Sequence, residues 1–357
     1  MHRRLRFIGL LMLALITVTV AVSGVFAAQG GVQSGAFHGP GYRGFSAFAI
    51  NARNPQIVYA GSGRGVFKSS NGGASWQAVN EGLTDRYVFD LAIDQHHPTI
   101  LYAATNSGVF KTTNAGRGWR ATSMPSISTI ALALHPRNAK VLYASTDDGV
   151  FKSSDAGRSW RGVTSHPGAV RVFALALDPK RPATVYAGAG GGLFKTTDGG
   201  SSWRVMNRDG FAPTRHDLAE GYFRALAINP QQPQTLYAGA GYGLFKTTDG
   251  AQHWRWVNRG SAHAGPAGSF YDVGSLAIDP HAPETLYAGT STPGLVKTTT
   301  GGRSWRSIDP PGKGDVVALA LDPTDPSTIY AGMRDGAHAF KSTDGGRTWS
   351  ALAIPVP

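Results

Sequence analysis

The chain has 357 residues, of which 41% are hydrophobic and 16% charged, so it can bury a sizeable core and is not of disordered composition. It contains no cysteine, which excludes disulfides, thiolate metal sites, cysteine nucleophiles and a lipoprotein anchor. Its formal charge of +12 suggests an acidic partner, nucleic acid or an anionic membrane surface.

Residues 1–27 are typical of an export signal. Three arginines precede an apolar run over residues 7–22, and small residues stand at the usual cleavage positions. We predict cleavage after Ala27. The alternative is an uncleaved anchor, because residues 7–28 approach the length that spans a bilayer. In either case the rest of the chain is expected outside the cytoplasm, with residues 28–43 as a lead-in.

Seven tryptophans mark seven internal repeats, and each closes an eight-residue motif that we call the box. In chain order the boxes read SSNGGASW, TTNAGRGW, SSDAGRSW, TTDGGSSW, TTDGAQHW, TTTGGRSW and STDGGRTW, and they end at Trp76, Trp119, Trp160, Trp203, Trp254, Trp305 and Trp349.

Each repeat also contains three short apolar stretches before its box. In the fourth repeat they lie at residues 173–179, 184–188 and 192–197, and Trp203 opens a fourth. Four short strands in a repeat of about 40–45 residues are typical of a propeller blade. The predicted fold is therefore an all-β, seven-bladed β-propeller of four-stranded antiparallel blades over residues 44–352, with 353–357 as a tail.

The residue types of the box suit a hairpin turn between the third and fourth strands. The Ser/Thr hydroxyl and the Asp/Asn side chain can accept N–H bonds of the turn, and glycine supplies a positive φ angle. The tryptophan is expected to fill space between layers. Three boxes depart from this pattern, through Gly118, through Ala251 and His253, and through Thr300. We expect these three hairpins to be less rigid.

The box resembles the Asp-box (BNR) repeat of sialidases, sortilin-type receptors, family 74 xyloglucanases and photosystem II assembly-factor propellers. The segments "TLYAG" and "GLFKTTDGG" are most similar to those of the last two groups. The resemblance covers residues 40–352. It implies the fold, and it does not select a function, because these families perform different functions.

The two faces of such a ring are expected to differ. The turns after the first and third strands, which include the boxes, share one face, here called the box face. The turns after the second and fourth strands share the other, the variable face. Two long insertions, at residues 209–221 and 260–271, fall on the variable face. Long loops are more often functional than short ones.

Arginine and tyrosine collect where the innermost strands begin, without being required by the repeat. They predict a ligand or partner site at the mouth of the central channel, formed by Arg43, Arg86, Tyr87, Arg171, Tyr222, Arg224, Tyr271 and Asp272. Arginine suits carboxylate recognition, and tyrosine gives rigid contacts. The alternative interpretation is that these arginines are simply solvated. Substituting Arg171 and Arg224 by alanine is expected to abolish binding without unfolding.

Much of the positive charge belongs to the repeat. One lysine recurs in every unit, at Lys68, Lys111, Lys152, Lys195, Lys246, Lys297 and Lys341, and arginines recur in and after the boxes. We expect these to be solvated strand positions that discourage edge pairing. Nucleic-acid binding requires one concentrated basic track, and the sequence contains none.

A glycoside hydrolase is the alternative function. Carboxylates on the variable face could supply an acid and a base or nucleophile: Asp147, Asp148, Asp217, Glu220, Asp272 and Asp315. Asp90 and Asp272 stand out because other repeats have apolar, small or hydroxyl residues in their columns. The resemblance weighs against this alternative. Family 74 enzymes close a cleft between two propellers, and the arginine triad of sialidases finds no match here.

The residues and the resemblance together favour an extracytoplasmic, non-enzymatic binding or assembly scaffold. Its expected partner is a protein or peptide, with a membrane complex or a carbohydrate as further options. No cofactor, metal or nucleic acid is expected, and the chain is predicted to be a monomer.

Overall fold

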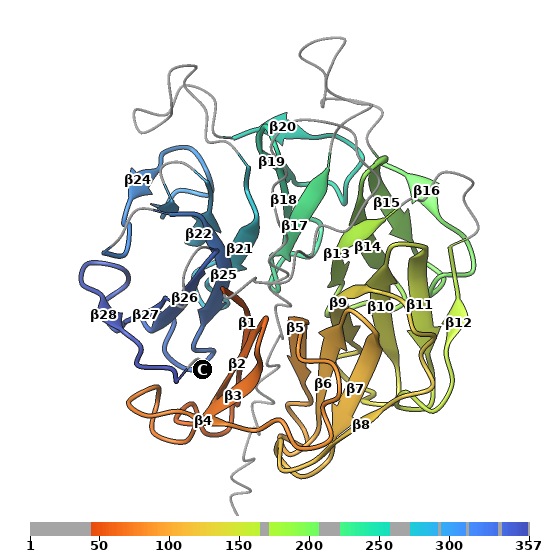
Figure 1. The fold of residues 1–357 in the computed structure, drawn as a ribbon. Coiled ribbons are helices and arrows are strands. Elements are labelled where there is room, and N and C mark those ends of the chain that lie inside the picture. Colours follow the sequence, from red (N-terminus) through yellow and green to blue (C-terminus); the bar gives the residue numbers. More distant parts are fainter. Residues whose placement is uncertain are drawn as a thin grey trace, which may run out of the picture.

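The computed structural model describes residues 44–164, 171–206, 222–257, 272–291, 294–311, 314–334 and 338–355. In these ranges the chain forms 28 strands and no helix, arranged as seven four-stranded antiparallel sheets in a ring (Figure 1). The predicted all-β, seven-bladed propeller is confirmed. No helix in the described ranges is long and apolar enough to cross a membrane. The predicted export signal lies outside these ranges.

Each blade contains four strands in chain order. The first, innermost strands are β1 (Phe45–Ile50), β5 (Val88–Ile93), β9 (Thr129–Leu134), β13 (Val172–Leu177), β17 (Phe223–Ile228), β21 (Ser275–Ile278) and β25 (Val316–Leu321). The second strands are β2 (Val58–Ser62), β6 (Leu101–Thr105), β10 (Leu142–Thr146), β14 (Val185–Ala189), β18 (Leu236–Ala240), β22 (Leu286–Gly289) and β26 (Ile329–Met333). The third strands are β3 (Gly65–Ser69), β7 (Gly108–Thr112), β11 (Gly149–Ser153), β15 (Gly192–Thr196), β19 (Gly243–Thr247), β23 (Leu295–Thr298) and β27 (Ala339–Ser342). The outermost strands are β4 (Gln77–Ala78), β8 (Trp119–Ala121), β12 (Arg161–Gly162), β16 (Arg204–Val205), β20 (Arg255–Trp256), β24 (Arg306–Ser307) and β28 (Ser350–Ala351).

The ring closes by packing between contiguous blades. β1 to β4 form the first blade and β25 to β28 the last, so no strand is exchanged between the two ends. The Tyr330 hydroxyl of the last blade donates to the Gly72 carbonyl oxygen of the first at 3.0 Å, and Lys341 Nζ donates to the same oxygen at 2.8 Å. Buried side chains of both blades form one apolar cluster.

The box forms the turn that the sequence predicts. In the seventh box the Ser342 hydroxyl accepts the Gly346 N–H at 2.9 Å and donates to Asp344 at 2.8 Å. Asp344 also accepts the N–H of Thr348 at 2.9 Å, and these bonds hold the pKa of its carboxyl well below the ordinary value. The Gly345 N–H donates to the Ser327 carbonyl oxygen at 2.9 Å, which places the box beside the turn between the first and second strands.

Box tryptophans join neighbouring blades, except Trp76, whose Nε1 donates to Gly73 of its own box. Trp349 Nε1 donates to the Ile308 carbonyl oxygen of the preceding blade at 2.8 Å, and Trp119 Nε1 donates to Val79 in the same way at 2.8 Å. Each of these rings therefore fills space between blades and also satisfies a main-chain acceptor across the gap.

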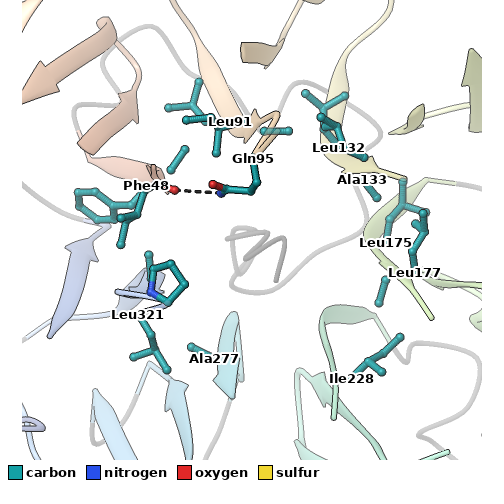
Figure 2. A pocket seen from close by; sticks show the side chains of 18 of the residues that line it. Phe48, Leu91, Gln95, Leu132, Ala133, Leu175, Leu177, Ile228, Ala277 and Leu321 are labelled. Carbon is teal, nitrogen blue, oxygen red and sulfur yellow. Dashed lines mark hydrogen bonds between the residues drawn. The ribbon is translucent and has the colours of Figure 1, made fainter. Parts of the chain in front are cut away.

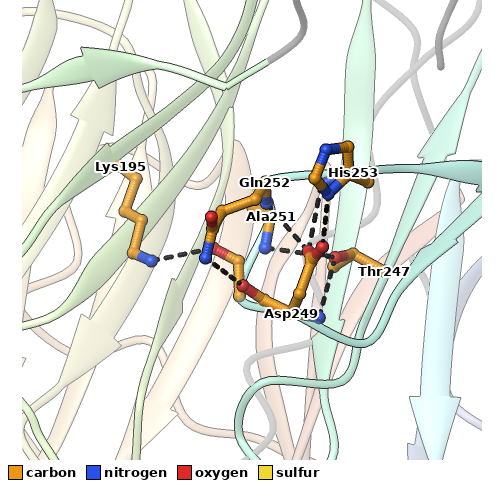
Figure 3. A network of polar contacts seen from close by, with 7 residues as sticks. Lys195, Thr247, Asp249, Ala251, Gln252 and His253 are labelled. Carbon is orange, nitrogen blue, oxygen red and sulfur yellow. Dashed lines mark hydrogen bonds and ion pairs between the residues drawn. The ribbon is translucent and has the colours of Figure 1, made fainter. Parts of the chain in front are cut away.

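Two of the three unusual boxes keep their side-chain bonds, and the expected lower rigidity of all three hairpins stays a prediction. In the fifth box His253 Nδ1 lies 2.7 Å from Asp249 Oδ2 and replaces the usual hydroxyl, although Ala251 adopts a φ of 74° (Figure 3). In the sixth box the Thr300 hydroxyl accepts the Ser304 N–H at 3.0 Å in place of a carboxylate. The second box has lost a bond, because Gly118 has no side chain to offer Asn114.

The repeated lysines are not simply solvated, and that expectation is wrong. Each is at least partly buried and donates to a carbonyl oxygen in the next blade's box, as Lys195 Nζ does to Gly250 at 2.8 Å (Figure 3). Each ammonium also lies 4.9 to 5.5 Å from the ring centre of a buried tyrosine in its own blade. The lysine column therefore clamps adjacent blades.

Candidate binding site at the channel mouth

The central channel is apolar along its box-face half. A cavity of about 110 Å³ there is lined by innermost-strand side chains of all seven blades, including Leu91, Leu132 and Leu175 (Figure 2). Gln95 is the one polar residue in this lining, and it is bonded to the chain: its Nε2 donates to Ile50 O at 3.0 Å, and its Oε1 accepts the Ala52 N–H at 2.9 Å. Among the described residues that line this half of the channel, no side chain is left free for polar chemistry.

Charged side chains gather at the other end, where the innermost strands begin. Arg224, the second residue of β17, forms an ion pair with Asp272. Arg334 follows β26, and its Nη2 lies 3.9 Å from Asp272 while its Nε lies 3.0 Å from Asp315. Blades five, six and seven thus share one ion-pair network.

A second pair and two aromatic rings extend this network. Arg171 Nε lies 2.6 Å from Asp147 Oδ1. The rings of Phe173 and Tyr222 meet edge-on at 5.5 Å between centroids. The guanidinium of Arg171 lies 5.8 Å from the Phe173 ring, and that of Arg224 lies 5.6 Å from the Tyr222 ring. Cations therefore support both rings.

The backbone at this mouth adopts an unusual conformation. Arg171 and Asp272 occupy the same column of the repeat and have φ values of 43° and 53°. Their N–H groups donate to the turns between the second and third strands, to Asp147 O at 3.0 Å and Gly241 O at 2.9 Å. Left-handed backbone at non-glycine residues is costly and is concentrated at functional sites. It distinguishes these two positions from the other described members of their column.

Burial dominates the electrostatics of the central pair. Arg224 and Asp272 are 7% and 9% exposed. Desolvation raises the pKa of Asp272, and the guanidiniums of Arg224 and Arg334 oppose this rise. Burial lowers the pKa of Arg224, and Asp272 opposes that shift. Each of the two groups therefore stabilises the charged form of the other.

The structure brings together four of the eight predicted site residues: Arg171, Tyr222, Arg224 and Asp272. Arg86 is exposed and Tyr87 half-buried in the second blade, and neither joins the ion-pair network. Arg43 and Tyr271 lie outside the described residues, as do both long insertions.

Two features of the mouth were not predicted. The first is Phe173, whose ring packs edge-on against that of Tyr222. Phe173 occupies the same repeat column as Arg224, and this shared column is the sequence signal that could have identified it. In addition, the arginines of this cluster already have carboxylate partners within the chain. Arg224 is too buried for the expected alanine substitution to leave the fold unchanged.

Most of the described carboxylates that the sequence offered for hydrolysis are bonded to other groups of the chain. Asp90 is 2% exposed, and its two oxygens accept the N–H groups of Leu91 and Leu132, each at 2.8 Å. Burial raises the pKa of Asp90 to about 7. Asp272 and Asp315 both contact Arg334. Asp217 and Glu220 lie outside the described ranges, within which no cluster of three potential metal ligands occurs.

Solved structures share this fold at low sequence identity. An ancestral GH74 enzyme is 21% identical with a TM-score of 0.69, and the match covers 88% of this chain but 46% of the enzyme. YCF48 bound to D1 peptide is 14% identical with a TM-score of 0.58, covering 83% of this chain and 92% of YCF48. An extracellular domain of a two-component system from B. thetaiotaomicron is 16% identical with a TM-score of 0.65, covering 90% and 40%. No family model and no curated protein matches the sequence.

Proposed function

We propose that this protein is an exported, non-enzymatic scaffold that binds a protein or peptide at the channel mouth on its variable face. Residues 1–27 would be the export signal, 28–43 a lead-in and 353–357 a tail. The GH74 enzymes, of which this chain spans about half, and YCF48 with its bound peptide support the fold of such a scaffold. An extracellular propeller among the structural neighbours is consistent with export.

The observation that carries the proposal is the exposed ring of Tyr222. It is the one large hydrophobic side chain exposed in the described ranges, at 44%. Phe173 meets it edge-on, and Arg224 lies over its face. A rigid aromatic ring beside charged groups loses little conformational entropy on binding, and tyrosine is enriched at binding hot spots.

A photocrosslinking amino acid at position 222 tests the proposal. The full-length protein, expressed in its own envelope, should form one discrete crosslinked product through position 222. The same probe at Arg347, exposed in a box on the other face, is the matched control. Tyr222→Ala should weaken binding of the captured partner by about tenfold or more, as for a hot-spot residue. A product that forms equally from position 347 would refute the assignment of the site.

Hydrolysis of glycosides remains the second candidate by fold likeness to GH74 enzymes alone. Among the described carboxylates of the mouth, Asp147, Asp272 and Asp315 are paired with arginine. Asp148 is exposed, and no second exposed carboxylate of the described mouth stands beside it as a catalytic partner. A general acid or nucleophile needs an accessible carboxyl group facing the substrate.

A further inference from the structure

The second box breaks the rule of its own repeat at one position. The residue before the tryptophan is Ser75, Ser159, Ser202, His253, Ser304 or Thr348 in the six other boxes, and Gly118 in this one. In the third box the Ser159 hydroxyl donates to Asp155 at 2.5 Å. The second box lacks this side-chain bond, because Gly118 has no hydroxyl.

Neither packing nor backbone conformation requires a glycine at this position. A Cβ added to Gly118 would meet only Asn114 Nδ2, at an ordinary 3.6 Å. Gly118 is also absent from the residues with positive φ. A departure that costs a stabilising bond without a local reason is typical of a functional site.

Gly118 lines a cleft between the second and third blades. The cleft has a volume of about 710 Å³ and lies at the outer edge of the ring, between β8 and the third box. Its walls carry three cations, Lys111, Arg120 and Arg158, and one acid, Glu81. It is distinct from the channel mouth in position and in residues.

The three cations are close to one another. Lys111 and Arg120 are directly paired across β7 and β8. Lys111 Nζ donates to the Ala156 carbonyl oxygen at 3.0 Å, beside Arg158, and burial together with Arg158 lowers the pKa of Lys111. No described carboxylate forms an ion pair with Arg120 or Arg158. The residues that line the cleft therefore carry more positive than negative charge, while Asp155 and Asp94 act on Lys111 from outside the lining.

The second box also supplies a neutral hydrogen-bond donor. It has Asn114 where four other boxes have aspartate. In the first box the equivalent Asn71 Nδ2 donates to Ser75 at 2.8 Å. Gly118 removes that acceptor, so the amide N–H of Asn114 can face the cleft. Thr113 and Ser123 also line it, and the Ser123 hydroxyl, which donates to the Arg158 carbonyl oxygen at 2.6 Å, can still accept a hydrogen bond.

We propose that this cleft binds an acidic oligosaccharide. Lys111, Arg120 and Arg158 would bind its carboxylate or sulfate groups, and Asn114 with the neighbouring hydroxyls would bind its uncharged oxygens. A cleft of about 710 Å³ is far larger than an inorganic anion and falls in the range of small-molecule sites. This site does not depend on the proposed function of the variable face.

The sixth and seventh blades offer a matched control. Lys297, Arg306 and Arg347 repeat the three cations there, but Ser304 occupies the position of Gly118 and its N–H and hydroxyl bond to Thr300. The boundary between blades two and three and that between blades six and seven therefore have the same three cations. They differ in the residue before the box tryptophan, which is Gly118 in one and Ser304 in the other.

Calorimetric titration of the full chain with digalacturonate and with a sulfated disaccharide tests the site, with cellobiose as the neutral probe and inorganic sulfate as the small one. At least one acidic disaccharide should bind saturably and cellobiose should not. Arg120→Ala/Arg158→Ala should raise its Kd by about tenfold or more, since two charge-assisted contacts are lost. Gly118→Ser should also weaken binding, while raising the melting temperature.

Three results would overturn the proposal. The first is the absence of saturable binding by both acidic disaccharides. The second is an equal loss of affinity in Arg306→Ala/Arg347→Ala, which would indicate unspecific attraction to positive charge. The third is inorganic sulfate binding as tightly as the disaccharides. Because Gly118→Ser restores the common box, its loss of binding cannot be ascribed to unfolding.

Discussion

The two faces of this propeller differ in how regularly their contacts repeat from blade to blade. On the box face, each blade repeats the same contacts: a box turn, a lysine clamp to the next blade and a buried tyrosine beneath it. On the variable face, the described charged residues at the channel mouth differ from blade to blade. Arg171, Arg224, Asp272 and Arg334 come from different columns or carry different partners, and two of them have left-handed backbone.

This difference separates stability from recognition. Contacts that recur in every blade hold neighbouring blades together, whichever ligand the protein binds. Side chains that occur once, at a mouth where the repeat requires nothing of them, are available for recognition. Substitutions on the two faces should therefore have different consequences.

Tyr330→Ala should cause the largest loss of stability. It removes a ring that is 1% exposed and the bond to Gly72 that closes the ring of blades. A free energy of unfolding lower by about 3–5 kcal/mol is expected for such a truncation. Chemical denaturation measures it. Tyr222→Ala, with an exposed ring, is the matched control and should change stability by less than about 1 kcal/mol; similar losses in both variants would contradict the division between faces.

Arg224→Ala should be the exception on the variable face. It leaves Asp272 buried without its nearest cation, and breaking a buried pair costs about 3 kcal/mol. The double variant Arg224→Met/Asp272→Asn should recover most of this loss, since neither charge of the pair then remains and asparagine tolerates the left-handed backbone of position 272. Thermal and denaturant unfolding of both variants would check this. A double variant less stable than Arg224→Ala would show that burial of the lone charge is not the cause.

Asp90 should make stability depend on pH. Burial raises its pKa in the folded protein to about 7, above the ordinary value of 3.8, so the folded chain holds this proton more tightly than the unfolded chain. The stabilisation is fully present below about pH 4 and is lost as pH rises towards 7. Five other repeats have alanine in this column, so Asp90→Ala is the natural reference. The stability of the wild type relative to this variant should fall between pH 4.5 and 8; a rise would contradict the assignment.

Ala251→Gly should have the smallest effect, and a favourable one. Ala251 has a φ of 74° at a position where all six other boxes have a glycine with positive φ. Relief of the left-handed strain is expected to add about 0.5–1 kcal/mol. In contrast, Ala176→Gly in β13 should destabilise by about as much, because a strand gains nothing from glycine's freedom. Melting temperatures of the two variants should move in opposite directions.

The repeat made most of the fold predictable. The spacing of the tryptophans and the recurring box were enough to assign the blades, their strand order and their two faces, because each blade makes the same local contacts. The lysines show the limit of that reasoning. Their charge suggested solvent, and only the position of the next blade reveals the carbonyl oxygen to which Lys195 donates.

The candidate site was predictable in location and only partly in chemistry. A column alignment identifies residues at the start of the inner strands, which is why Arg171, Tyr222, Arg224 and Asp272 could be named together. Which arginine meets which carboxylate depends on distances between blades that lie about 50 residues apart in the chain, such as Arg224 and Asp272. Local patterns establish turns, strands and faces, whereas pairing and burial of charges across blades arise from the closed ring.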